Sequence, residues 1–193
     1  IGMVGDDFAP YRDHYQRWGI DSSCLVPAKD SYTAQCFIVT DLHNNQLAGF
    51  HPGAMARSAQ IPVAQAGDVA CGLVGPDAKD AMQLHTKQMA DALVPFILDP
   101  GQNILLFSGP ELLELIDQAP VLVCNDYEAE LITDKTGLTL EQLALRRRRD
   151  PDRDRIDRED ARQLLRQVLA HPRQLALRRQ LGRQRAEPPP ERP

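Results

Sequence analysis

No apolar run in the 193-residue sequence is long enough to span a membrane, and no segment resembles a secretory signal peptide. We therefore expect a cytoplasmic protein with no membrane partner. Cysteine is scarce as well: four are present, without a C-x-x-C pair or a histidine at zinc-ligand spacing. Each lies in an apolar run typical of a strand, which favours buried, reduced thiols over metal or disulfide roles (Cys24, Cys36, Cys71 and Cys124).

Two common phosphate-binding fingerprints are also missing. The sequence contains neither a G-x-x-x-x-G-K-[ST] loop nor a G-x-G-x-x-G turn. The histidines are scattered, and none accompanies a serine or cysteine in a nucleophile motif, so we assign them no catalytic role. Any phosphate site in this chain must therefore use another type of loop, such as the free N–H groups at the start of a helix.

The charge is unevenly distributed along the chain. Residues 1–145 carry 7 Lys and Arg against 19 Asp and Glu, whereas residues 146–193 carry 15 Arg against 8 Asp and Glu. No lysine follows Lys135, and the chain closes with AEPPPERP. This contrast predicts an acidic domain over residues 1–145 and a largely disordered tail over residues 146–193, within which residues 158–170 fit an amphipathic helix. No aromatic residues interleave the basic run, so we do not expect a nucleic-acid partner.

The first part of the chain carries the signals of a helix and a β-hairpin. PYRDHYQRWG predicts a short helix with one aromatic face, which Gly19 ends in a left-handed conformation. YTAQCFIVTD is rich in β-branched and aromatic residues, HNNQ is typical of a turn, and LAGFHPG fits a returning strand. We therefore predict a β-hairpin over residues 32–53.

From residue 69 onward, apolar runs alternate with helical patterns. VACGLVG, PFILD and VLVC fit buried strands, and each precedes a helical pattern. This order predicts an α/β fold with a parallel sheet and right-handed crossovers. The three strands are followed by VGPD (residues 74–77), DPGQ (residues 99–102) and NDYE (residues 125–128). Because ligands gather at the carboxyl ends of parallel strands, these segments point to one site.

The polar residues in these segments support two interpretations. Asn is a favourable N-cap residue and Glu three positions later completes a capping box, so spacing alone favours a structural role for Asn125 and Glu128. The same helix start offers N–H groups to an anion, and a carboxylate beside a phosphate implies an intervening Mg²⁺. Asp99 could brace its turn, or face Mg²⁺ or a substrate hydroxyl. The GDD run at Gly5–Asp7 is typical of turn chemistry.

Four segments, taken in their order and spacing, resemble the PfkB (ribokinase-like) sugar and nucleoside kinases. They are GMVGDDFAPYRDHYQRWGID, YTAQCFIVTDLHNNQLAGFHPGAM, FILDPGQ and NDYEAEL. Each motif is weak when taken singly, and their combination is specific. The resemblance covers about residues 1–145, and the best match is the bacterial branch described as adenosine-kinase-like.

The resemblance implies a three-layer α/β/α domain, here truncated, with a small β-sheet lid. The hairpin at residues 32–53 would be this lid, closing over a sugar or nucleoside and excluding water. Thr33, Gln35 and Phe37 alternate along its first strand and would share the face that looks at the substrate. A homodimer formed through the lid is also compatible with the resemblance.

The resemblance further implies ATP and Mg²⁺ as cofactors. The family's N-x-x-E motif falls on Asn125 and Glu128, which would organise the phosphate and the metal, Glu128 acting on Mg²⁺ indirectly. Asp99 lies where the family places a polar residue at a strand end near the phosphate path. The expected substrate is a small-molecule sugar or nucleoside with a free hydroxyl group.

The sequence departs from the family pattern at both ends. The family's Gly-Gly segment, with a nearby Asn and an earlier Asp that hold the substrate hydroxyls, would lie before Ile1. The G-A-G-D motif, which supplies an anion hole and the catalytic Asp base, does not occur after residue 137. We therefore expect a kinase fragment that is inactive as this chain, with an irregular or helical tail. A frameshift near residue 146 is one hypothesis for the tail. The alternatives are a non-catalytic binding protein and a non-functional gene product.

Overall fold

The computed structural model describes residues 1–147, with side chains up to residue 144. These residues belong to one compact unit, Ile1–Asp150. The predictions made for the tail over residues 146–193 lie outside the described residues, apart from the last two residues of α5 (Leu140–Arg147). No helix in the described part is long and apolar enough to cross a membrane.

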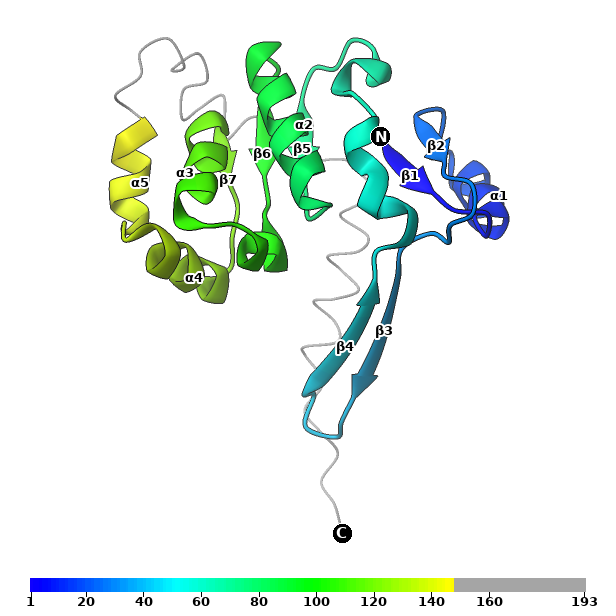
Figure 1. Ribbon diagram of the computed structural model, residues 1–193, viewed down its shortest axis with the longest axis horizontal. Coiled ribbons are helices and arrows are strands. Elements are labelled where there is room, and N and C mark those ends of the chain that lie inside the picture. The colour runs from blue at the N-terminus through cyan, green and yellow to red at the C-terminus, as the bar shows by residue number, and fades with distance from the viewer. Residues whose placement is uncertain (148–193) are drawn as a thin grey trace. The chain divides into compact units, whose positions relative to one another are not determined.

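The chain begins with a parallel pair of short strands. β1 (Gly2–Val4) pairs with β2 (Leu25–Pro27), and α1 (Ala9–Trp18) connects them (Figure 1). As predicted, α1 ends at Gly19, whose φ of 63° is left-handed. β2 lies in the apolar run at Cys24 that is typical of a strand, and its three residues, which include a proline, carry only a weak strand signal.

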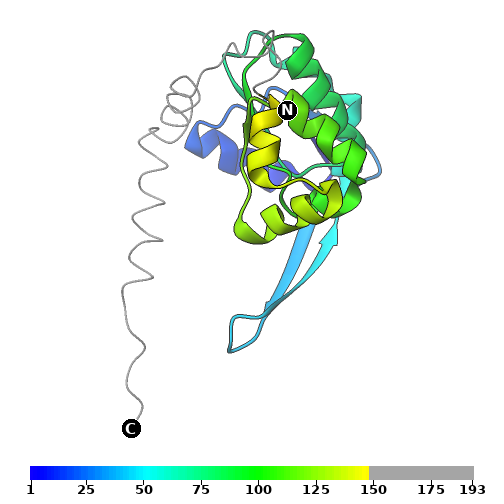
Figure 2. The same cartoon turned by 90° about the vertical axis from the view of Figure 1, so that its left-hand side faces the viewer.

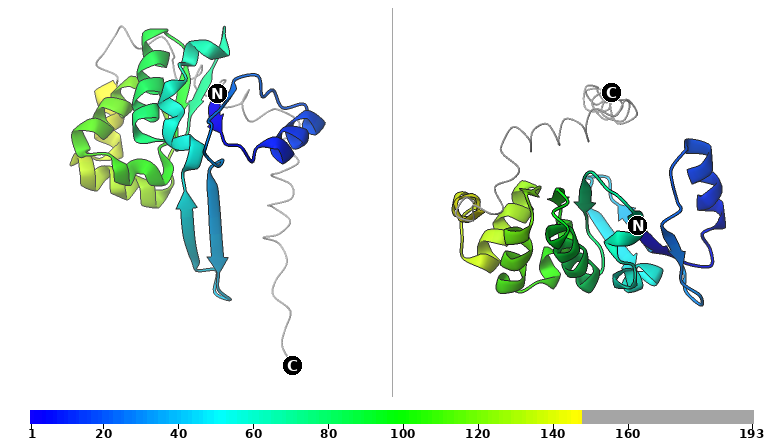
Figure 3. Two further views of the ribbon diagram at one scale, coloured as in Figure 1. Left: turned by 45° about the vertical axis from the view of Figure 1, so that its right-hand side comes forward. Right: turned by 90° about the horizontal axis from the view of Figure 1, so that it is seen from above.

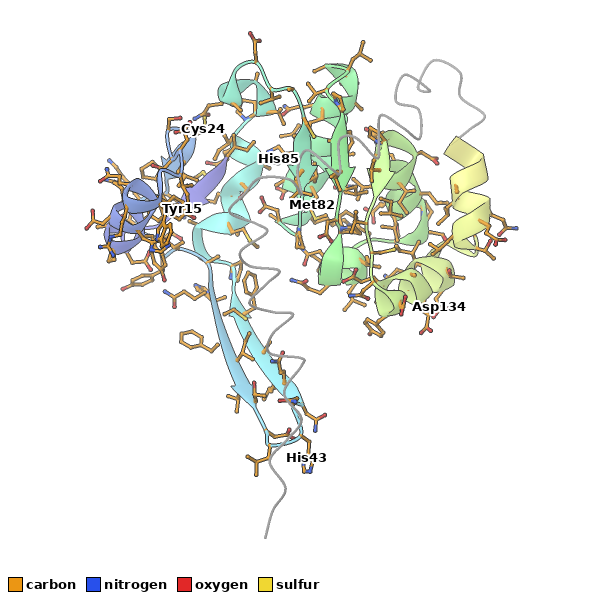
Figure 4. All side chains as sticks on the ribbon, turned by 180° about the vertical axis from the view of Figure 1, so that it is seen from behind. Tyr15, Cys24, His43, Met82, His85 and Asp134 are labelled. Atoms are coloured by element: carbon orange, nitrogen blue, oxygen red, sulfur yellow. The ribbon has the colours of Figure 1, made fainter. Side chains whose placement is uncertain are left out.

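The hairpin predicted over residues 32–53 is confirmed. β3 (Gln35–Thr40) and β4 (Gln46–His51) pair antiparallel and extend away from the rest of the described residues (Figures 1 and 2). The loop at the tip is held by the carboxylate of Asp41, which accepts the N–H groups of His43 at 2.8 Å and Asn45 at 2.9 Å. Figure 4 shows His43 at this tip.

The cysteines are free, but the prediction that they are buried is wrong. Cys36 on β3 is exposed, and the other three are half-buried. The physical reason for Cys36 is the hairpin itself, because two strands alone bury neither of their faces. Apolar neighbours along the hairpin are exposed for the same reason, and Phe37 is 68% exposed.

Beyond the hairpin, short 3₁₀ segments lead into an alternating α/β region. The sequence pattern does not predict η1 (Gly53–Gln60) or η2 (Val63–Ala66). The alternation itself is confirmed. Its elements are β5 (Gly72–Val74), α2 (Lys79–Asp91), β6 (Phe96–Leu98), η3 (Gly101–Leu106), α3 (Gly109–Gln118), β7 (Val121–Leu122), α4 (Asp126–Thr136) and α5.

β5, β6 and β7 form one parallel sheet in that order. α2 and α3 pack on one side of this sheet, as Figure 3 shows. The contact buries apolar side chains of the two helices against those of the strands (Met82, Met89, Leu112, Leu115 and Ile116 against Val74, Phe96 and Leu98). Each fully buried side chain of this size contributes about 1.5–3 kcal/mol, so this contact is the main core.

α2 also joins the first part of the chain to the sheet. His85 on α2 is nearly buried, and its Nε2 lies 2.8 Å from the carbonyl oxygen of Ile61. Ile61 belongs to a smaller apolar cluster that includes Met3 on β1. Figure 4 shows His85 and Met82 on the same helix. Both sheets are therefore anchored to α2.

A capping box formed by Ser108 and Glu111 begins α3. The N–H of Ser108 donates to Glu111 at 2.8 Å, and the Lys79 ammonium lies 2.8 Å from the same carboxylate. The hydrogen bond from Lys79, followed by those from Ser108, lowers the pKa of Glu111 to about 2. This carboxylate therefore stays charged at neutral pH.

Candidate active site at the strand ends and the hairpin base

The carboxyl ends of β5, β6 and β7 lie side by side. The N–H of Asp99, directly after β6, donates to the carbonyl of Val74 at 2.9 Å, and the N–H of Val123 donates to that of Leu98 at 2.9 Å. The structure thus brings together the three polar segments that the sequence predicts at one edge of the sheet (residues 74–77, 99–102 and 125–128).

The first two of these segments interlock. Asn103 donates its side-chain N–H to the carbonyl of Asp77 at 2.6 Å. Gly101 has a φ of 49°, and a Cβ at this position would lie 2.7 Å from Pro76. The N–H of Gly101 also donates to the carboxylate of Asp99. Asp99 therefore does brace its turn, and its remaining lone pairs are available to a ligand.

The third segment begins α4 with a complete capping box. The side-chain oxygen of Asn125 accepts the N–H of Glu128 at 2.9 Å. In return, Glu128 accepts the backbone N–H of Asn125 at 2.9 Å and its side-chain N–H at 2.8 Å. The structural interpretation of the N-x-x-E spacing is therefore correct as geometry, and it leaves Asn125 exposed and Glu128 half-buried just after β7.

Negative charge is concentrated at these strand ends. Burial raises the pKa of Asp99 above its ordinary value of 3.8, and the charge of Glu128 raises it further. Burial also raises the pKa of the Cys124 thiol, followed by the charges of Glu128, Asp99 and Asp126. Because the charges of all three carboxylates raise the pKa of the same thiol, the three carboxylates lie near one another around Cys124. The electrostatic arrangement favours a cation there.

A hydrated Mg²⁺ would fit this arrangement. Mg²⁺ takes oxygen ligands and usually binds one or two carboxylates, while waters and phosphate oxygens complete its shell. Asp99 and Glu128 supply two carboxylates whose mutual repulsion a cation would relieve. No group of three or more His, Cys, Asp or Glu residues among the described residues is arranged to hold a metal alone. Phosphate and water would therefore have to complete the shell.

Replacing Asp99 with asparagine is expected to stabilise the chain at about pH 7, by roughly 1–3 °C in Tm. Asparagine keeps an oxygen for the N–H of Gly101 but removes a charge that burial and Glu128 disfavour. The folded-state pKa of Asp99 is raised, so the wild-type carboxylate lowers stability as the pH rises from its ordinary pKa of 3.8 through the folded value. The stabilisation should therefore disappear near about pH 3.

Thermal unfolding monitored by circular dichroism between about pH 3 and pH 8 measures this difference. Asp126→Asn is the matched control, because Asp126 lies in the first turn of α4, where negative charge is favourable. The control should not raise Tm. An Asp99→Asn chain with the Tm of the wild type at neutral pH would contradict the expected charge concentration.

A second group of polar residues holds the hairpin at its base. The carboxylate of Asp7 accepts the N–H of Thr33 at 2.7 Å, its hydroxyl at 2.8 Å and the side-chain N–H of Gln35 at 3.2 Å. The N–H of Gly5 donates to the hydroxyl oxygen of Thr33 at 3.0 Å. These bonds, the backbone N–H of Thr33 first, lower the pKa of Asp7. The carboxylate is therefore ionised at neutral pH.

Asp7 is the residue of this group that sequence reasoning misses. The turn at Gly5–Asp7 forms as predicted, but Asp7 also reaches a partner 26 positions later. The available signal is weak: an acidic pair between a strand and a helix, with a hydroxyl and an amide at the start of a later strand. Nothing local to the GDD run specifies Thr33 as the partner.

The six predicted site residues thus lie in two groups. Asp99, Asn125 and Glu128 gather at the strand ends, whereas Thr33 and Gln35 meet on Asp7 and Phe37 lies farther along β3. Gln35 and Phe37 share one face of β3 because their positions differ by two. Within the described residues, no hydrogen bond connects the two groups.

Comparison with known proteins identifies related sequences over most of the described part. A sequence model of the pfkB family of carbohydrate kinases matches residues 1–167. The nucleoside kinase of Methanothermobacter thermautotrophicus is 26% identical over 153 residues, which cover 74% of this chain and 48% of that protein.

Solved structures give the same picture. Burkholderia thailandensis nucleoside kinase in complex with inosine is 42% identical, with a TM-score of 0.73 over 76% of this chain and 49% of that one. Its complex with ADP-inosine has a TM-score of 0.71. The Methanocaldococcus jannaschii nucleoside kinase, an archaeal member of the ribokinase family, reaches 0.67 at 22% identity and bears on the fold alone. The ribokinase-like α/β fold is confirmed, and the chain spans about half the length of these relatives.

Proposed function

Because the chain belongs to the pfkB family of carbohydrate kinases, we propose that it contributes the lid and the phosphate-organising strand ends of an ATP-dependent nucleoside kinase. The reaction transfers the terminal phosphoryl group of ATP to a nucleoside hydroxyl, whose proton is released. The observation that carries this proposal is the pair Asp99 and Glu128, whose charges interact at the carboxyl ends of adjacent parallel strands. Mg²⁺ bound there would neutralise phosphate charge.

The residues at the strand ends have distinct roles in this proposal. Asp99 and Glu128 would hold the hydrated metal, and Asn125 fixes the carboxylate of Glu128 through two hydrogen bonds. The start of α4 presents N–H groups and the positive end of the helix dipole to the phosphate. Charge compensation and orientation are the main contributions that a protein makes to phosphoryl transfer.

The hairpin residues would select and cover the substrate. Asp7 accepts the side-chain N–H of Gln35, so the amide oxygen of Gln35 is left to accept a hydrogen bond from a substrate hydroxyl. Phe37 on the same face offers an exposed ring on which a base can stack. A nucleoside is favoured over a simple sugar because the 42% identical Burkholderia protein was solved with inosine. Its complex with ADP-inosine supports ATP as the phosphoryl donor.

Inosine is therefore expected to bind the 193-residue chain. Its affinity should fall in the Phe37→Ala variant, which lacks the ring on which the base would stack. Saturation-transfer NMR with inosine, adenosine and ribose compares the wild type with Phe37→Ala. We expect a loss of at least about 5-fold in inosine affinity, since stacking on an aromatic ring is worth ~1 kcal/mol. Leu42→Ala is the control, because Leu42 is fully exposed at the hairpin tip. Equal inosine binding by all three chains would refute the assigned lid face.

The chain of 193 residues is expected not to turn over ATP. No G-A-G-D motif follows residue 137, so the base that accepts the hydroxyl proton has no counterpart in the printed sequence. Coupled-enzyme detection of ADP with adenosine, inosine, ribose and fructose measures the rate. Turnover above roughly 10⁻² s⁻¹ on any of them would contradict this expectation, since kinases typically turn over at about 1–100 s⁻¹.

The other face of the hairpin suits a second copy of the lid. Cys36, Ile38 and Phe50 lie on the face opposite Phe37, and Ile38 and Phe50 are more than half exposed. We expect a homodimer that Phe50→Asp dissociates, because a charge replaces an apolar contact. Leu47→Asp on the Phe37 face is the matched control. Sedimentation velocity should show a loss of dimer for Phe50→Asp alone.

A cytoplasmic location, where ATP is available, belongs to the same proposal of an ATP-dependent kinase.

A further inference from the structure

Asp7 uses its two carboxylate oxygens for different partners. Its Oδ1 accepts the backbone N–H of Thr33 at 2.7 Å and the Thr33 hydroxyl at 2.8 Å. Its Oδ2 accepts the side-chain N–H of Gln35 at 3.2 Å. Hydrogen bonds, that from the backbone N–H of Thr33 first, lower the pKa of Asp7, so neither oxygen carries a proton at neutral pH. Both oxygens are therefore acceptors, one toward Thr33 and the other toward Gln35.

The Oδ2 atom of Asp7 fixes the orientation of the Gln35 amide. A glutamine amide has an NH₂ donor at one end and an oxygen acceptor at the other. Because an ionised carboxylate only accepts, it holds the NH₂ end of Gln35. Gln35 is half-buried at the start of β3, and its amide oxygen is left for a donor on a ligand.

The bonds to Thr33 determine which side of residue 7 has to be an acceptor. A backbone N–H only donates, so the atom that faces the Thr33 N–H must be an oxygen. The Thr33 hydroxyl is fixed as well, because it accepts the N–H of Gly5 at 3.0 Å while it donates to Asp7. An asparagine at this position would therefore keep its oxygen toward Thr33 and turn its NH₂ toward Gln35. The Gln35 amide would then have to turn, so that its own NH₂ becomes the free end.

We propose that Asp7 is a specificity-determining residue of the nucleoside site, which it serves by orienting Gln35 so that the hairpin offers an acceptor to the ligand. This inference rests on the proposed function and deepens it, since Gln35 shares the face of β3 with Phe37. Asp7 acts through Gln35 rather than on the ligand itself. The selected ligands present a hydrogen-bond donor at this point. A ribose hydroxyl can donate there, whereas a methyl ether at the same position can only accept.

The test compares inosine with 2′-O-methylinosine and 3′-O-methylinosine, titrated by calorimetry into the 193-residue chain. For one of the two ethers, the wild type should prefer inosine by at least about 10-fold, because the ether leaves the Gln35 oxygen without a donor. In Asp7→Asn this preference should fall by about 10-fold, because an NH₂ group donates to a hydroxyl or an ether oxygen alike. Comparing the preference between chains cancels the effect of the larger methyl ether.

Two control chains separate this role from a structural one. In a chain that carries Gln35→Met, adding Asp7→Asn should change the preference by less than about 2-fold, because no amide remains to turn. Asp6→Asn is the matched control for the loss of charge, since the carboxylate of Asp6 accepts the N–H of Asp30 instead. Its preference for inosine should equal that of the wild type.

Nuclear magnetic resonance of the isotope-labelled chain reports the Gln35 amide without any ligand. In the wild type, one side-chain N–H of Gln35 donates to a carboxylate, so its resonance should lie downfield and its exchange with water should be slow. Both features should disappear in Asp7→Asn, while the Thr33 N–H keeps part of its protection and shows that the hairpin is still held.

The outcomes distinguish this inference from the function on which it rests. Identical Gln35 amide signals in the wild type and Asp7→Asn would overturn the role of Asp7. An unchanged preference in chains that bind inosine would overturn it as well, and would leave the nucleoside site standing. Absence of inosine binding by the wild type would instead refute the proposed function, and the selection by Asp7 with it.

Discussion

Replacing Gly5 with alanine is expected to destabilise the chain by at least roughly 3 kcal/mol, which is large for a single methyl group. A Cβ at Gly5 would collide with backbone atoms of Ser31, Tyr32 and Thr33. Backbone atoms cannot rotate away as the end of a side chain can, so β1 and the start of the hairpin would have to separate. The N–H of Gly5, which donates to Thr33, would be displaced at the same time.

Chemical denaturation followed by circular dichroism measures this loss as a lower midpoint at unchanged slope. Gly49→Ala is the matched control, because a Cβ at Gly49 on β4 meets its nearest neighbour, the carbonyl oxygen of Phe37, at 3.9 Å. The control changes the same residue type, and it lies within the hairpin itself. A Gly5→Ala chain as stable as the Gly49→Ala chain would show that the base of the hairpin can open at little cost.

Replacing Asp7 with alanine is expected to release the hairpin from the sheet without unfolding the α/β core. The substitution removes the acceptor of three hydrogen bonds from Thr33 and Gln35. The backbone N–H of Thr33 is partly buried and would be left without its partner. Hydrogen exchange at this N–H should become faster on the order of 10²-fold. Exchange within α2 and α3 should not change.

The neighbouring acid supplies the control for this experiment. Asp6 accepts one hydrogen bond, from the N–H of Asp30 at 3.2 Å, so Asp6→Ala should leave exchange at Thr33 within about 3-fold of the wild type. Asp7→Asn keeps one oxygen for Thr33, so the exchange rate of the Thr33 N–H in this variant should lie between the rates in Asp6→Ala and Asp7→Ala. Slow exchange at Thr33 in the Asp7→Ala chain would mean that the hairpin is held by other contacts.

Much of the fold follows from local sequence signals, and α4 shows why. Its start and end depend on residues within one helical turn, Asn125 and Glu128 at one end and Gly137 at the other. The order of the parallel strands follows in the same way, since alternating strands and helices admit few connections. The hairpin at residues 32–53 is predicted by equally local patterns.

The contacts that define the candidate site are less visible in the sequence. The convergence of Asp99 and Glu128 at adjacent strand ends follows from the topology. The raised pKa of Asp99 does not, because it depends on how far the surrounding structure excludes water. Asp7 is missed for a related reason. The local sequence of a turn is the same whether its carboxylate faces solvent or the hairpin. η1 and η2 are held by tertiary packing and carry little pattern of their own.

The two ends of the hairpin meet at a single place on the body of the protein. The carbonyl of Tyr32 accepts the N–H of Ala54 at 2.7 Å, while Gly53, at a φ of 50°, approaches the same carbonyl too closely for any side chain. The hairpin is therefore a segment whose two ends are held close together. Doubling the length of such a segment adds only about 0.6 kcal/mol of loop-closure entropy. The hairpin can therefore be lengthened, shortened or exchanged as a module while the sheet beneath keeps its fold.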